Sequence, residues 1–170
     1  MRPRKKLQSS VINSETFLTM LEPLKHGLYN FILKAVNFSE DGDDVFQETV
    51  LRAFKYIDTY DPRRPFKAWI FSVAYNQIKN HYKRLGEEGG LLPAQLMERI
   101  PEVGEDERLR DIFEVASGLE PKQRSVFFFF YYNRFSIGEI ADITGLSEGN
   151  VKFILNAGRN SIRKKMEIEP

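Results

Sequence analysis

The chain has 170 residues with no cysteine and two histidines, and its charges nearly balance at a formal net charge of +1. The lack of cysteine excludes disulfides, thiol catalysis and cysteine-ligated metals, and two histidines do not make a histidine-rich metal centre. The sequence has no run of about 18 apolar residues, so no membrane span is predicted. The basic N-terminal residues are not followed by the apolar segment of a secretory signal. The composition therefore predicts a cytoplasmic protein without metal, cofactor or membrane insertion.

The charge is distributed unevenly along the chain. Residues 86–107 hold seven Asp or Glu against one Arg, with four glycines and two prolines, whereas residues 1–85 hold 14 Lys or Arg against 9 Asp or Glu. Residues 108–170 are also net basic, with 10 against 8. Because glycine and proline at this density end helices and strands, the acidic segment predicts a flexible linker between two basic domains. Basic surfaces favour a nucleic-acid partner over the alternative of solvated charge without a function.

Helical spacing of apolar residues recurs throughout, which predicts an all-α fold. Because a flexible linker joins the two small domains, we expect them to be extended and mobile relative to each other in the free protein. The predicted organisation is a basic N-terminal tail (1–13), a first helical domain (14–85), an acidic flexible linker (86–106), a second helical domain with a helix-turn-helix (107–166) and a C-terminal tail (167–170).

Three helices are predicted in the first domain. Ser14 is expected to cap the first helix. The second follows the acidic cluster that begins at Asp41, where negative charge suits a helix N-terminus. A third runs from Pro65-Phe66 to about Arg84. The expected core positions are Phe46, Val50, Ala53, Phe54 and Ile57 in the second helix and Phe66, Ile70, Val73, Ala74, Ile78 and Tyr82 in the third.

The second domain is expected to begin with a helix over about 107–117, followed by a helix from Pro121 that buries the aromatic run 127–132. Ser136 and Glu139 have the spacing of a capping box, which opens a short helix before a tight turn at Gly145. Ser147 then caps a last helix with a basic end. A short helix, a glycine-containing turn and a longer helix predict a helix-turn-helix.

Two outward surfaces of the first domain have functional potential. The second helix has an outward ridge, here called the docking ridge, in which an apolar residue among charges favours a protein-binding surface: Asp44, Gln47, Glu48, Leu51 and Arg52. Its acidic start is explained by helix capping better than by a metal site. The third helix has cations and amides on one face, flanked by Trp69 and Tyr75, as single-stranded nucleic acid requires. An ordinary amphipathic helix with Trp69 in the core is the alternative. No catalytic set emerges, so an enzyme is not expected.

Several segments together resemble a known family. Residues 43–54 (DDVFQETVLRAF), 66–70 (FKAWI) and 74–76 (AYN) resemble region 2 of bacterial extracytoplasmic-function sigma factors. Residues 119–126 (LEPKQRSV), 135–141 (FSIGEIA) and 146–152 (LSEGNVK) resemble region 4. The resemblance implies an all-α promoter-specificity subunit of RNA polymerase, with an anti-sigma factor as a further partner.

The resemblance also implies roles for individual residues. The docking ridge corresponds to the surface that contacts the β′ clamp helices of core RNA polymerase. The positions that correspond to minus-ten promoter binding are Trp69, Asn76, Lys79, Asn80 and Lys83. The positions that correspond to minus-thirty-five binding are Ser147, Asn150, Lys152, Phe153, Asn156 and Arg159. The last helix has apolar residues where the family often has arginine, so fewer phosphate contacts are expected. Gly158 is expected to weaken this helix.

Three functions are compatible with these features. A sigma factor that docks on core polymerase and directs promoter recognition, minus-ten melting and initiation agrees with all of them. A sigma-like decoy, which binds an anti-sigma factor without initiating transcription, is favoured by the arginine-poor last helix and opposed by the intact set Trp69, Asn76 and Lys79. A simple helix-turn-helix repressor would not need the docking ridge.

Overall fold

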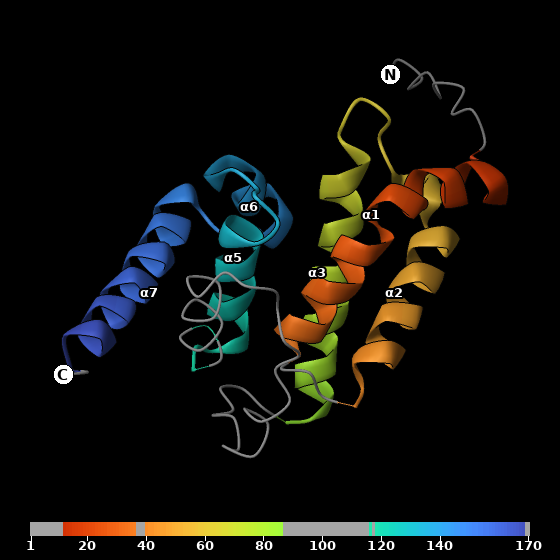
Figure 1. Ribbon diagram of the computed structural model, residues 1–170. Coiled ribbons are helices and arrows are strands. Elements are labelled where there is room, and N and C mark those ends of the chain that lie inside the picture. The colour runs from red at the N-terminus through yellow and green to blue at the C-terminus, as the bar shows by residue number, and fades with distance from the viewer. Residues whose placement is uncertain (1–11, 37–39, 87–115, 117, 169–170) are drawn as a thin grey trace, which may run out of the picture.

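The computed structural model describes residues 12–36, 40–86, 116 and 118–168, and the regular elements among them are all helices (Figure 1). The predicted all-α class is confirmed. The predicted helix at 107–117 and the predicted linker lie outside the described residues, apart from Gly86 and Ala116. The helices are α1 (Ser14–Ala35), α2 (Gly42–Lys55), the 3₁₀ helix η1 (Ile57–Thr59), α3 (Phe66–Arg84), α5 (Pro121–Tyr131), α6 (Ile137–Thr144) and α7 (Glu148–Ile168).

Side chains close the N-terminal ends of α1 and α6. The prediction that Ser14 caps α1 is wrong by one residue, because Asn13 Oδ1 accepts a hydrogen bond from the Thr16 amide at 2.8 Å and Ser14 lies in the first turn. The capping box of α6 is confirmed. The Ser136 amide donates to Glu139 Oε2 at 2.8 Å, and the Glu139 amide donates to Ser136 Oγ at 3.2 Å.

The end of α5 directs the chain back into the core. Arg134 has a left-handed conformation with φ of 58°, and beyond it the Phe135 amide donates to the Phe129 carbonyl at 2.9 Å. This bond turns the chain after α5 back onto the last turn of the helix, and it brings Phe135 onto Phe129. The rings of Phe129 and Phe135 accordingly meet edge to face at 5.7 Å.

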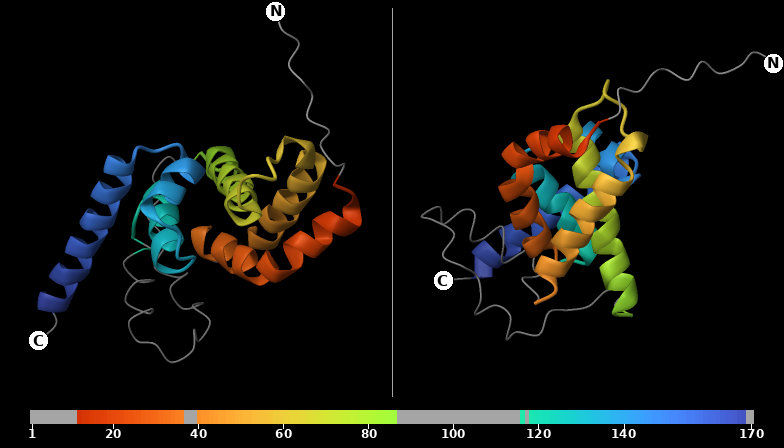
Figure 2. Two further views of the ribbon diagram at one scale, coloured as in Figure 1. Left: turned by 90° about the horizontal axis from the view of Figure 1, so that it is seen from above. Right: turned by 90° about the vertical axis from the view of Figure 1, so that its right-hand side faces the viewer.

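Helices α1, α2 and α3 contact one another and form the first unit (Figure 2). On α3 the predicted core positions are buried, except for the half-buried Val73. On α2 the predicted core is only partly right. Ala53 is buried as predicted, but Phe46 is half-buried and Phe54 is exposed, and the other buried side chains of the helix are Val45 and Thr49. Small residues allow α2 to approach its neighbours closely, so its aromatic side chains lie at the edge of the contact.

Helices α5, α6 and α7 form the second unit, in which α7 packs on α5 and α6. Val151 and Leu155 are buried. Gly158 is also buried, and a Cβ atom added there would lie 2.9 Å from Cδ2 of Phe127, whose ring is fully buried. The absence of a side chain at this position therefore allows α7 to pack closely on α5.

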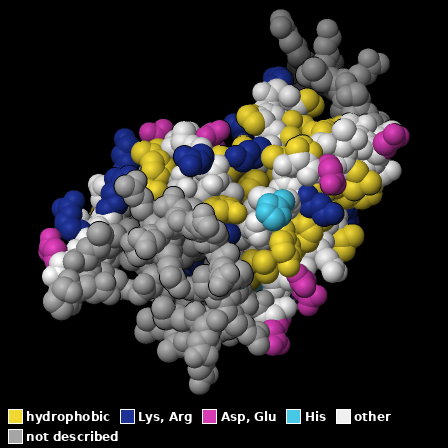
Figure 3. Space-filling view, viewed as in Figure 1, with side chains coloured by type: hydrophobic (Ala, Val, Ile, Leu, Met, Phe, Trp, Pro, Cys, Tyr) yellow, Lys and Arg dark blue, Asp and Glu magenta, His cyan; other side chains and the backbone are white. Residues whose placement is uncertain are grey.

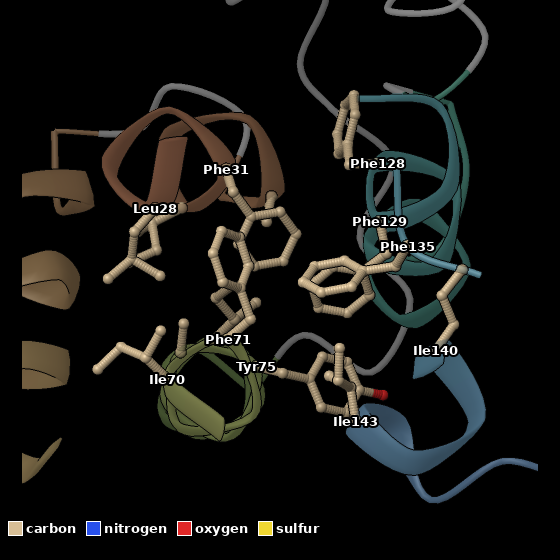
Figure 4. Close-up of a cluster of buried hydrophobic side chains, with 14 of the residues drawn as sticks. Leu28, Phe31, Ile70, Phe71, Tyr75, Phe128, Phe129, Phe135, Ile140 and Ile143 are labelled. Atoms are coloured by element: carbon tan, nitrogen blue, oxygen red, sulfur yellow. The ribbon is translucent and has the colours of Figure 1, made fainter. Parts of the chain in front are cut away.

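The two units pack directly on each other. Helix α5 contacts α1 and α3, and α6 contacts α3. At this junction Phe129 stacks on Phe31 with ring centroids 4.5 Å apart, and Phe71 meets Phe135 at 5.3 Å (Figure 4). All four rings are buried, and burying one phenylalanine side chain stabilises a fold by about 1.5–3 kcal/mol. The structure thus differs from the prediction of an extended free protein, because apolar rings on both units cover each other.

Candidate functional site

The docking ridge lies on the outward face of α2. Asp44, Gln47 and Arg52 are exposed, and 69% of Leu51 is exposed. Glu48 is half-buried, with Oε2 3.4 Å from Nη2 of Arg84 on α3 and Oε1 4.0 Å from Nε of Arg52. The docking ridge therefore has an exposed apolar residue, Leu51, among charged side chains, and one of these, Glu48, contacts Arg84 on α3.

Sequence reasoning missed an aromatic part of this surface. Phe54 is 44% exposed and its ring lies 5.4 Å from that of Phe17 on α1. Tyr56, just after α2, and Leu18, on α1, are also exposed. The partly incorrect core prediction for α2 hid this signal, because it assigned Phe54 to the core. Exposed large apolar side chains near a ridge of charges are typical of protein–protein interfaces.

The outward face of α3 presents polar side chains at helical spacing, and we call it the α3 face. It comprises Asn76, Lys79, Asn80 and Lys83, all of them exposed. Lys79 Nζ lies 4.8 Å from the centre of the Tyr75 ring. The expectation that Tyr75 flanks this face as an exposed ring is wrong. Only 1% of Tyr75 is exposed, because the second unit covers it, and this burial raises the pKa of its hydroxyl.

Trp69 is half-buried at the start of α3 and borders a cavity of about 210 Å³. Its ring packs against Tyr60 at 5.4 Å and against Phe66 at 5.7 Å. Tyr60 and Arg64 contribute an aromatic ring and a cation from the segment before α3, and α6 contributes two carboxylates. Sequence reasoning did not single out Tyr60 or Arg64, although their aromatic and basic character just ahead of Trp69 is visible in the sequence.

The segment before α3 is held in a fixed turn. Arg63 donates to Asp61 from Nε at 2.9 Å and from Nη2 at 2.8 Å, and the Arg64 amide donates to the Asp61 carbonyl at 2.9 Å. Hydrogen bonds from Arg63 lower the pKa of Asp61 to about 2. The burial of Tyr60, together with the nearby Asp61 charge, raises the pKa of the Tyr60 hydroxyl. The turn orders the backbone that borders the Trp69 cavity.

A second cavity of about 500 Å³ lies between α3 and α5. Three lysines border it: Lys79, Lys83 and Lys122, with Glu120 as the acidic residue among the lining side chains. The cavity therefore extends the basic character of the α3 face towards the second unit.

On the second unit, α6, the turn and α7 follow in the order expected for a helix-turn-helix. Gly145 ends α6 in a left-handed conformation with φ of 73°, and Ser147 Oγ accepts from the Asn150 amide at 3.1 Å. Lys152 is exposed, and Phe153 is 70% exposed. Lys and Arg side chains follow α7 along one edge of the molecule (Figure 3).

Two of the predicted minus-thirty-five residues are engaged within the protein. Arg159 donates from Nε to the Tyr131 hydroxyl at 2.6 Å and from Nη1 to Asn156 Oδ1 at 3.1 Å. The bond to Tyr131 ties Arg159 to α5, so Lys152 and Phe153 are more available to a partner.

Within the described ranges, no group of three or more His, Asp or Glu side chains is placed to hold a metal ion. No helix in this part of the chain is both long and apolar enough to cross a membrane.

Comparison with protein families identifies both halves of the chain. Residues 20–88 match Sigma-70 region 2, and residues 109–162 match Sigma-70 region 4. Together the two matches cover more than two thirds of the chain.

Individual relatives agree with these matches. The chain is 24% identical to the ECF RNA polymerase sigma factor SigW of Bacillus subtilis over 91% of this chain and 90% of SigW. It is 26% identical to ECF sigma factor SigL of Mycobacterium tuberculosis over 82% of each chain.

Two solved structures share the fold. The sigma factor RpoE of Bartonella quintana, in complex with the anti-sigma factor NepR, aligns with a TM-score of 0.73 at 20% identity, over 92% of this chain and 99% of RpoE. CnrH, in complex with the cytosolic domain of CnrY, aligns with a TM-score of 0.69 at 23% identity, over 93% and 92%. The chain belongs to the sigma-70 family and is an extracytoplasmic-function RNA polymerase sigma factor with regions 2 and 4.

Proposed function

We propose that the docking ridge binds the β′ clamp helices of core RNA polymerase, that Trp69 and the α3 face bind the unwound minus-ten element, and that α7 contacts the minus-thirty-five element. The polymerase supplies the chemistry, and the chain acts with it in the cytoplasm as an initiation factor rather than as an enzyme. The observation that carries this proposal is the exposed α3 face beside the Trp69 cavity.

Two kinds of contact support minus-ten binding. Lysines on the α3 face suit phosphates, which position the strand without reading its sequence. Amides such as Asn76 present both a donor and an acceptor to an unpaired base edge, and the aromatic wall of the Trp69 cavity suits base stacking. Strand melting follows if unpaired bases bind here in preference to paired ones.

The side chains near the start of α7 suit contacts with the bases and phosphates of the minus-thirty-five element. Residues near the start of a recognition helix face base edges, and the exposed ring of Phe153 suits contact with a thymine methyl group. Lys152 suits a phosphate. Ser147, Asn150 and Asn156 complete the proposed surface, whereas Arg159 contributes by bracing α7 on α5.

An anti-sigma factor is the proposed restraining partner. Two proteins of the same fold were solved with a protein partner: RpoE with the anti-sigma factor NepR, and CnrH with the cytosolic domain of CnrY. Leu51 on the docking ridge and Phe54 beside it are exposed apolar residues, which suit contact with a protein that competes with polymerase.

Replacing Gln47, Glu48 and Arg52 together with Ala is expected to weaken binding to core polymerase by at least about ten-fold, because interface residues at the centre of a contact contribute 1.4 kcal/mol or more. The fold is expected to remain intact, since surface changes cost about 0.5 kcal/mol or less each. Surface plasmon resonance with immobilised core enzyme measures the affinity.

The control for this variant is Thr16→Ala, Glu22→Ala and Lys25→Ala, a triple change of the same net charge on exposed positions of α1. It is expected to bind like the wild-type protein. If both triple variants bound core polymerase with the same affinity, the polymerase contact would lie outside the docking ridge.

The Asn76→Ala and Lys79→Ala variants are expected to lose different properties of DNA binding. Loss of the Asn76 amide should reduce discrimination at one base of the minus-ten element, by about 1–3 kcal/mol, whereas loss of the Lys79 cation should weaken binding to all sequences and flatten the salt dependence. Binding of holoenzyme to a set of single-base promoter variants at several salt concentrations measures both effects. The same uniform loss for both variants would contradict the division of roles.

A further inference from the structure

The cavity between α3 and α5 is bordered by lysines from both helices. Lys79 and Lys83 lie one turn apart on α3, and Lys122 lies in the first turn of α5. All three residues are exposed, and none of them takes part in an ion pair within the described part of the chain. With Glu120 as the acidic residue, the described lining has a net charge of +2. Because like charges around one cavity repel one another, a bound anion would stabilise this arrangement.

The start of α5 adds to the positive character of the same cavity. Glu120 precedes the helix, and its side chain makes no capping hydrogen bond. The backbone amides of the first turn, including that of Lys122, are therefore not capped by this carboxylate. Since the N-terminal end of a helix has partial positive charge, it supports the lysines in favouring an anion.

Other parts of the cavity wall are apolar and aromatic. Ile78, Pro121 and Tyr82 border the cavity. The Tyr82 hydroxyl is fixed from behind, because it donates to the Ala35 carbonyl at 2.8 Å and accepts from Nη1 of the buried Arg124 at 2.9 Å. The aromatic wall is therefore formed before any ligand binds, which reduces the cost of ordering it.

The size and the two kinds of wall indicate the class of ligand. The volume of about 500 Å³ lies within the range of about 300–1,000 Å³ that is typical of small-molecule sites. A single phosphate would use only the charged part of this cavity, and an apolar molecule would leave its lysines without a partner. A nucleoside diphosphate suits both parts, because its phosphates match the lysines and its flat base can pack against an aromatic ring.

We propose that the cavity between α3 and α5 binds a nucleoside diphosphate, with the phosphates on Lys79, Lys83 and Lys122 and the base against the ring of Tyr82. Lys79 and Lys83 also belong to the α3 face, whereas Lys122 and the start of α5 have no part in the proposed DNA contacts. The nucleotide site is therefore independent of the minus-ten assignment, and it is tested on the free protein without DNA or polymerase.

Isothermal titration calorimetry of the full chain with ADP and with GDP tests this proposal. The titration is made without Mg²⁺ at about 50 mM salt, where exposed charges are weakly screened. We expect saturable binding of one nucleotide per chain with a dissociation constant below about 1 mM. Pyrophosphate and adenosine, which represent the two parts of ADP, are each expected to bind at least about ten-fold more weakly, because each reaches one kind of wall.

Two results of this titration would overturn the proposal. The first is the absence of saturable binding of both nucleotides up to about 10 mM. The second is binding of pyrophosphate or adenosine as tight as that of ADP, because the aromatic wall or the lysines would then contribute nothing.

Two charge changes at the cavity are expected to shift ADP affinity in opposite directions. Lys122→Ala removes an attractive charge and should weaken binding about five-fold, whereas Glu120→Gln removes a repulsive charge and should strengthen it about two-fold. The matched controls are Lys25→Ala and Glu22→Gln, which make the same charge changes at exposed positions of α1. The controls are expected to bind ADP like the wild-type protein. If each cavity variant had the same affinity as its control, ADP would respond to the net charge of the protein and not to this cavity, and the proposal would be overturned.

Discussion

Phe129→Ala is expected to lower the free energy of unfolding by about 3–5 kcal/mol, the usual cost of truncating a buried phenylalanine. The ring is fully buried and contacts rings of both units: Phe31, Phe71, Tyr75 and Phe135. Since little of the surrounding layer can collapse into the space, the cavity should remain. Urea denaturation followed by circular dichroism measures the loss.

Phe130→Ala is the matched control, since it makes the same change one position along the same helix. Phe130 is half-buried, and its ring contacts Tyr131 and the Arg159 guanidinium. It is expected to cost less than half as much as Phe129→Ala. Similar losses for the two variants would contradict the position of Phe129 in a core shared by the two units.

Gly158→Ala is expected to destabilise the protein by about 1–3 kcal/mol, although alanine is the better helix former by about 1 kcal/mol. The added Cβ would overlap the Phe127 ring, which is fully buried. Thermal and urea denaturation measure the change. The helix-weakening effect expected for this glycine is therefore only part of its role.

Gly149→Ala provides the comparison within the same helix. A Cβ there would have its nearest neighbour, Ser147 Oγ, at 3.9 Å, which is ordinary contact. This variant is expected to be neutral or more stable by a few tenths of a kcal/mol. If Gly158→Ala were stabilised like Gly149→Ala, the close packing of α7 on α5 would be contradicted.

The sequence was sufficient for the helices whose apolar pattern is unambiguous. The core positions of α3 and the capping box at Ser136 follow from spacing and cap chemistry, and the structure confirms them. The core of α2 was not fully predictable in this way. Its large aromatic residues Phe46 and Phe54 suggest one face, whereas the helix buries Val45 and Thr49 together with the predicted Ala53. Size and hydrophobicity alone do not decide which face approaches a neighbouring helix most closely.

The burial of Tyr75 and the junction between the units depend on tertiary contacts. Tyr75 lies between the polar and apolar stripes of α3, and in the folded protein it packs against Phe129 of the second unit. The acidic composition of the segment between the units indicates a linker but contains no information on whether the units touch. The aromatic run in α5 was the available signal, since one helix face cannot bury so many rings within a small unit.

The outward orientation of the site residues was predicted more completely than the contacts around them. The docking ridge and the α3 face point towards solvent as expected, because charged and amide side chains at helical spacing indicate a solvent-exposed face. The additions from the structure are Phe54, Tyr60 and Arg64, together with the carboxylates of α6 at the Trp69 cavity. Arg159 differs from the expectation because the Tyr131 hydroxyl draws it back onto α5.

The central claim is that this chain directs core RNA polymerase to promoters, and in vitro transcription with core enzyme on sheared genomic DNA of the source organism tests it most directly. Sequencing the 5′ ends of the transcripts should give discrete start sites that are preceded by common minus-ten and minus-thirty-five sequences. These transcripts should be absent with core enzyme alone and reduced by the Gln47, Glu48 and Arg52 triple variant. A folded protein that binds core enzyme but yields no start sites above the core-only background would contradict the account and favour a sigma-like decoy.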